Sequence, residues 1–90
     1  MKGKVGDMTA ARLKAFLEQG REIEFSYVGH PYFMAPVFAE NVFTNTYYIY
    51  DSLAQCTVFT GCLHDVLVYE FSPGVSFEKK MEAFDFAYIL

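Results

Sequence analysis

Side chains that could bind a metal gather at one place in the sequence, where Cys62, His64 and Asp65 stand within four residues. A metal site needs several His, Cys or carboxylate ligands that converge on one ion. On a helix these side chains would point around the axis, because residues two positions apart do not share a face. On a strand Cys62 and His64 would share a face, but the sequence supplies no further ligands nearby. We therefore predict no metal ion and no cofactor.

The sequence gives equally little support for nucleophilic catalysis. A reactive cysteine needs a histidine within hydrogen-bond reach and, usually, a third group that orients the histidine. Cys56 or Cys62 could meet His30 or His64 only through the tertiary structure, and no glycine elbow or glycine-rich phosphate loop is present. Cys56 is expected in the core, because unpaired cysteines are among the most buried residue types. The sequence favours a protein that is not an enzyme, and it identifies no catalytic residue.

A pair of carboxylates, Glu22 and Glu24, stands at alternate positions of an expected strand. Two carboxylates act as acid and base only where burial or repulsion separates their pKa values. On the polar face of a strand they more simply face solvent and discourage pairing at a sheet edge. We expect a polar rim rather than a catalytic pair.

Aromatic residues are the most informative feature, since seven Tyr and ten Phe make up 19% of the chain. Tyr47 and Ile49 alternate with Tyr48 and Tyr50, so an extended strand would be aromatic on both faces. One face can pack on the N-terminal helix, and the other needs the later helices, the C-terminal tail or another chain to cover it. Tyrosine is enriched at interfaces. We therefore predict an interface that contains Phe33, Phe38, Tyr48 and Tyr50, with Glu22 and Glu24 at its rim.

Length, charge and cysteine content limit the class of protein. Ninety residues fit one domain, residues 1–90, with a net charge of −4. No Lys or Arg occurs between Arg21 and Lys79, so the central strands lack the cations that a nucleic-acid surface needs. Two cysteines are few for a small secreted domain, and we find neither a signal-peptide stretch nor a membrane-spanning run. We expect a soluble cytoplasmic protein that binds no membrane, and no nucleic acid through its sheet.

The order of hydrophobic patterns predicts an α+β domain. Its N-terminal helix would pack on a three- to four-stranded antiparallel meander, followed by one or two short C-terminal helices. The first helix is expected over residues 8–19, capped by Asp7 and ended by Gly20. Leu13 and Leu17 lie on its apolar stripe.

Four strands are expected from period-two alternation and turn residues. Pro36 places its part of the second strand at an edge, a bulge or the strand's end, because proline cannot donate a ladder hydrogen bond. A turn is expected at residues 29–31 and a loop at 40–45. The strands themselves are predicted over residues 21–28, 32–38, 46–50 and 55–60.

The C-terminal third allows two interpretations. Residues 63–71 fit either a short helix capped by Thr60 or a strand, and we favour the helix. Ser76 is expected to cap a final helix. The apolar tail, residues 86–90, should pack on the core or add a strand.

Parts of the chain resemble a known group of proteins. The segment GREIEFSYVG at residues 20–29, then YIYD at 48–51 and YIL at 88–90, is similar to short uncharacterised proteins of Gram-positive bacteria and their mobile elements. The likeness covers the order of elements over most of the chain. It implies a helix-plus-meander fold and a bacterial cytosolic setting, and it carries no functional residue.

Three functions from different classes remain open. The leading hypothesis is a non-catalytic interaction module that buries an aromatic sheet face, most simply in a twofold homodimer. The first alternative is an acidic inhibitor or decoy that docks on a basic surface of a partner protein, with salt-sensitive binding. The second is a ligand-binding protein or enzyme with a Tyr- and Phe-lined pocket, in which His30 or His64 titrates beside a carboxylate or thiol. Two histidines on open surface would exclude it, and the small molecule itself is unknown.

Overall fold

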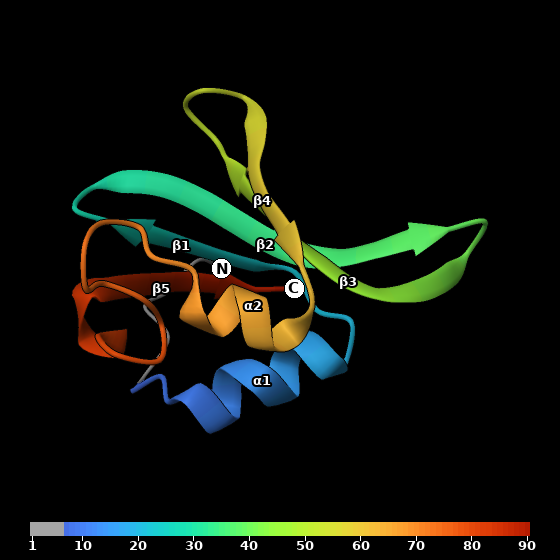
Figure 1. Ribbon diagram of the computed structural model, residues 1–90, viewed down its shortest axis with the longest axis horizontal. Helices are drawn as coiled ribbons and strands as arrows, with labels where there is room; N and C mark the ends of the chain where they lie inside the picture. The colour runs from blue at the N-terminus through green and yellow to red at the C-terminus, as the bar shows by residue number, and fades with distance from the viewer. Residues whose placement is uncertain (1–6) are drawn as a thin grey trace.

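The computed structural model describes residues 7–90, which form two α-helices and a five-stranded antiparallel sheet with strand order β4-β3-β2-β1-β5. Both helices lie on one face of the sheet, and the β2–β3 hairpin extends beyond them (Figure 1). The predicted α+β class with an antiparallel sheet is confirmed. The expected three to four strands are too few, because the C-terminal tail supplies a fifth. No helix within residues 7–90 is long and apolar enough to span a membrane.

The first helix, α1, spans Ala10–Glu18 and buries Leu13 and Leu17 as predicted. Its N-cap is Thr9, whose hydroxyl accepts a hydrogen bond from the Arg12 backbone N–H at 3.1 Å. The cap predicted at Asp7 is therefore wrong, and threonine caps the helix two residues later by the same chemistry. Gly20 follows the helix with a φ of 80°, which confirms the predicted helix end.

Strands β1 (Ile23–Tyr27) and β2 (His30–Ala39) form the predicted hairpin. Only Val28 and Gly29 make the turn, with φ values of 50° and 75°. Two successive left-handed residues match the twist of the flanking strands in a tight hairpin. The strand therefore resumes at His30 instead of after the turn expected at 29–31.

Pro36 lies in the second half of β2, beyond the residues that pair with β1. There β2 is bonded only to β3 (Val42–Asp51), and the register shifts between Pro36 and Phe38. A proline is tolerated at such a point because no donor is needed on the open side. Of the edge, bulge or strand end that the sequence allowed for Pro36, the structure shows the bulge.

The loop expected at 40–45 is wrong, because β3 already begins at Val42. Glu40 and Asn41 alone make the turn, with φ values of 51° and 66°. Asn45, with a φ of 59°, sits inside the strand near the register shift, so this turn former produces an irregular strand rather than a loop. The fourth predicted strand is confirmed as β4 (Cys56–Gly61).

The second helix, α2, spans Leu63–Val68, which confirms the helical interpretation of this segment. Cys62 occupies its N-cap position, whereas the predicted cap, Thr60, belongs to β4. The helix predicted after Ser76 is wrong. Ser76 accepts one hydrogen bond from the Lys79 backbone N–H at 3.2 Å, but only a short 3-10 turn, η1 (Met81–Ala83), follows.

The tail forms β5 (Phe84–Ile89), which pairs antiparallel with β1. Phe84 and Phe86 are buried while their neighbours are exposed, which is the period-two pattern of a strand. The expectation that the tail adds a strand is confirmed. Phe77, just before η1, is fully buried, and its ring centroid lies 4.5 Å from that of Phe84 and 5.2 Å from that of Phe25. The core therefore lies between the sheet and the helices.

Candidate functional site

The sheet face turned away from the helices, the outer face, carries three of the predicted contact residues. Tyr50 pairs with Phe33, and Tyr48 pairs with Ala35 on the neighbouring strand. Cross-strand partners share a face of the sheet. One row therefore crosses all five strands, through Thr57, Tyr50, Phe33, Glu24 and Tyr88. We call Phe33, Tyr48 and Tyr50 the aromatic outer face.

The rings of the aromatic outer face pack against one another. The Phe33 centroid lies 4.9 Å from that of Tyr50 and 5.8 Å from that of Tyr48, the latter edge-on at 75°. All three side chains stay half-buried. On the inner face of the same strands, Met34 and Ile49 are 0% exposed. The two faces thus differ in how completely they are covered.

No element within residues 7–90 lies over the aromatic outer face. Both helices and the segment 69–83 lie on the inner side (Figure 1), where Phe71 and Phe77 contact Phe25. The tail extends the sheet beside β1 instead of folding over it. The sequence left open whether the later helices or the tail cover this face. Both segments take other positions, so neither covers it.

Glu22 and Glu24 give the outer face an acidic border along β1. Glu24 is half-buried and stands between Phe33 and Tyr88 in the row, while Glu22 is exposed just before the strand. Burial, and then the charge of Glu22, raise the pKa of Tyr48 above its ordinary value. Glu22 thus lies just outside the sheet and Glu24 lies within the row, and the predicted interface rim stays a prediction.

Phe38 does not join the other predicted contact residues. It pairs with Phe43 near the tip of the β2–β3 hairpin, and together they line a groove beside Leu17 of α1. That groove is on the inner side of the sheet. Residues 33 and 38 are an odd number of positions apart, so the alternation of a strand sends their side chains to opposite faces.

Cys62, His64 and Asp65 lie at the start of α2, where Cys62 Sγ donates a hydrogen bond to Asp65 Oδ2 at 3.2 Å. His64 is exposed. Among residues 7–90, no three His, Cys, Asp or Glu side chains gather closely enough to hold a metal ion. Cys56 and Cys62 are free and exposed, so the prediction that Cys56 is a core residue is wrong. Cys56 is the first residue of the edge strand β4, next to the exposed β3–β4 turn.

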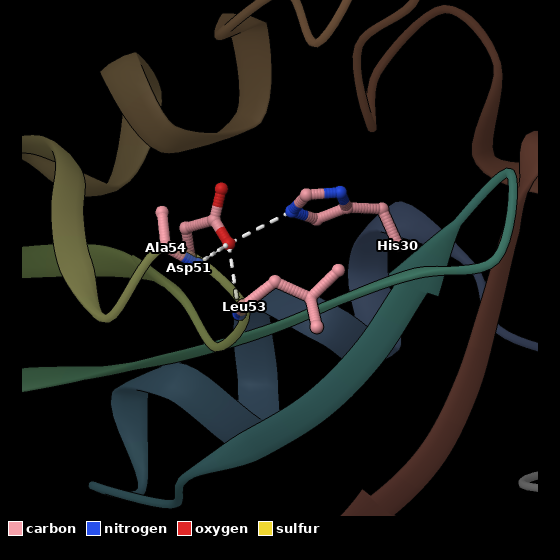
Figure 2. Close-up of polar contacts among 4 residues, drawn as sticks. All are labelled: His30, Asp51, Leu53 and Ala54. Atoms are coloured by element: carbon pink, nitrogen blue, oxygen red, sulfur yellow. Dashed lines mark hydrogen bonds and ion pairs between the residues drawn. The ribbon is translucent and has the colours of Figure 1, made fainter.

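A contact that the sequence did not predict joins His30, at the start of β2, to Asp51, at the end of β3 (Figure 2). His30 Nε2 lies 2.8 Å from Asp51 Oδ1. The same oxygen accepts backbone N–H bonds from Leu53 at 3.0 Å and Ala54 at 2.9 Å. The Ala54 amide and then the His30 hydrogen bond lower the pKa of Asp51 below its ordinary value. The carboxylate is therefore held in its ionised form.

The His30–Asp51 pair meets the geometric condition of the ligand-binding or enzyme alternative, since one histidine converges with a carboxylate. Its bonds, however, tie the β3–β4 turn to the β1–β2 hairpin. Cys56 pairs with Asp51 in the sheet register, but no hydrogen bond joins a cysteine to a histidine within the described part of the chain. A thiol is activated by direct contact with the base. The arrangement is a structural clamp between two turns.

Tyr88 and Asp51 are the residues of these sites that sequence reasoning missed. Tyr88 joins the outer-face row only because β5 pairs with β1. The alternation through Phe84 and Phe86 was the available signal for that strand. Asp51 lies 21 positions from His30, and local spacing carried no signal for their contact.

Comparison with known proteins adds no evidence on the fold or the function of the chain. No family model, no curated protein and no solved structure matches the chain. The resemblance to short proteins of Gram-positive bacteria therefore stays a prediction.

Proposed function

We propose that the protein is a non-catalytic interaction module that self-associates through its aromatic outer face. The observation that carries the proposal is the uncovered position of Phe33, Tyr48 and Tyr50 on the sheet. Tyrosine suits such a surface because its ring offers apolar area while its hydroxyl tolerates water. A twofold homodimer would place the same face of both copies in contact.

The association would follow the geometry of two sheets that pack face to face. Two sheets stack face to face about 10 Å apart, with side chains of both faces interdigitating. Glu22 would then remain near the edge of the contact, where a charge costs little, whereas Glu24 would lie inside it, next to Phe33. Free cysteines at positions 56 and 62 accord with a reducing compartment, so we also place the protein in the cytoplasm.

The experiment is the molar mass in solution, measured by light scattering after size exclusion at several protein concentrations. Wild type should show twice the mass of one chain. Replacing Tyr48 and Tyr50 by Ala together should weaken association by more than about thirtyfold, or about 2 kcal/mol, as expected for central aromatic contacts.

Phe38→Ala is the matched control, because it removes an exposed aromatic ring from the opposite side of the sheet. It should leave the dimer unchanged. A wild-type monomer at every concentration would refute the proposal. Equal weakening by Phe38→Ala and by the tyrosine variant would refute the assignment to the outer face.

A further inference from the structure

An open groove runs between the C-terminal end of α1 and the β2–β3 hairpin, on the inner side of the sheet. It consists of two adjoining hollows of about 230 and about 380 Å³, which share Glu18 and Phe43. Leu17 and Pro36 line the first hollow and Leu63 lines the second. The groove lies on the opposite side of the sheet from the aromatic outer face, so the two surfaces can act independently.

Three aromatic rings in a row form one wall of the groove. The Phe38 and Phe43 centroids lie 5.9 Å apart, and those of Phe43 and Tyr47 lie 5.3 Å apart at 64°. Tyr47 is 3% exposed and anchors the row in the core, whereas Phe38 is 56% exposed. The row of rings therefore starts at the buried Tyr47 and ends at Phe38, whose ring is accessible to a ligand.

Glu18 is the only acidic or basic residue among those that line the two hollows. Glu18 is the last residue of α1 and borders both hollows. The C-terminal end of a helix carries a partial negative charge, and no basic residue stands in the last turn of α1. None of the residues that line either hollow is basic. Glu18 and Tyr47 line the same hollow, and burial, and then Glu18, raise the pKa of Tyr47.

Aromatic faces next to a carboxylate recognise an organic cation. A guanidinium stacks on aromatic rings and bonds a carboxylate through two parallel N–H groups, which an ammonium group cannot do. We propose that this groove binds an arginine side chain presented by a partner protein. The planar cation would lie against Phe38 and Phe43 and donate hydrogen bonds to Glu18.

The chain's own arginines are already engaged. Arg12 and Arg21 both lie over the Phe16 ring, each with its guanidinium carbon 5.7 Å from the centroid. Arg21 Nε also donates to Gln19 Oε1 at 3.0 Å. A second copy of this chain therefore has no unengaged arginine to offer, which favours a different protein as the partner.

The test titrates the ¹⁵N-labelled protein with a short peptide that is blocked at both ends and carries one arginine as its single charge, followed by nuclear magnetic resonance. Control peptides carry citrulline, which has the same shape without the charge, or lysine. The arginine peptide should shift the amides of Gly20, Phe38 and Phe43 saturably, with a dissociation constant on the order of 1 mM. The citrulline and lysine peptides should bind at least about tenfold and about threefold more weakly.

Glu18→Gln and Phe38→Ala should each weaken the arginine peptide by at least about fivefold, and both residues are exposed enough for the variants to fold. Tyr50→Ala on the outer face is the matched control and should leave binding unchanged, whatever it does to self-association. Equal binding of arginine and citrulline peptides, or full binding by Glu18→Gln, would overturn the proposal. Methylguanidinium binding as tightly as the peptide would make a free cation the occupant and would also overturn it.

Discussion

Asp51 shows how one side chain can join segments that the sequence keeps apart. Its Oδ1 accepts bonds from two amides of its own turn and lies beside the His30 ring, whose centroid is 4.7 Å from that of Tyr32 with the rings tilted by 34°. Hydrogen bonds to a carboxylate favour its charged form, and the lowered pKa of Asp51 expresses that preference. The pair thus links the two turns at one end of the sheet most strongly while Asp51 is ionised.

This linkage predicts acid sensitivity. A lowered pKa means that Asp51 stabilises the fold at every pH above its ordinary value of 3.8, and that the contribution is lost as the pH falls through the lowered value. Asp51→Asn should be less stable than wild type in urea at about pH 7, and the difference should shrink as the pH falls below 3.8. Glu78→Gln, an exposed carboxylate, should keep the wild-type profile. A difference that stays constant with pH would contradict this account.

At the scale of elements, the turns and bulges decide which face each side chain takes. The β1–β2 turn contains Val28 at a φ of 50°, although a β-branched residue strongly disfavours that conformation. Its side chain is 84% exposed and has little packing to compensate. The turn therefore contains local strain that a better residue could remove.

Val28→Asn should raise the free energy of unfolding by about 1 kcal/mol, because asparagine adopts the left-handed conformation readily. Chemical denaturation measures the change. Val58→Asn provides the same substitution at an exposed position of β4, and it should lower stability because asparagine disfavours strands. The turn assignment would fail if both variants were destabilised alike.

At the scale of the whole molecule, the sheet separates a closed core from an open face. Phe77 is fully buried on the inner side, whereas Phe33 lies half-buried on the other. The stability of one chain should therefore depend on the inner side, and association on the outer one.

Phe77→Ala should lower the free energy of unfolding by about 3–5 kcal/mol, since it leaves a cavity in the core. Phe33→Ala should cost only about 1 kcal/mol of monomer stability while weakening self-association. Denaturation at protein concentrations low enough for the monomer separates the two effects. If Phe33→Ala destabilised the monomer as much as Phe77→Ala does, the outer face would be part of the hydrophobic core of a single chain.

Local patterns predicted part of this fold because they depend on neighbours in the sequence. The stripe of Leu13 and Leu17 and the glycine at position 20 defined the first helix. The predicted last helix is wrong, although Phe77 and Phe84 fit a helical spacing. The two rings enter the core from separate segments, Phe77 from the loop before η1 and Phe84 from the start of β5. The groove at Glu18 left no local pattern at all, since its walls come from both helices and a hairpin.

The sequence by itself determined the α+β class, the first helix, the aromatic alternation of the third strand and the lack of cations at its centre. Each of these follows from residue type and period alone. The tertiary structure decided that β5 pairs with β1, that Phe38 faces away from Tyr48 and Tyr50, and that His30 meets Asp51. Such outcomes depend on strand pairing and register between distant segments, because each segment gains its stability only when its buried face finds a complement.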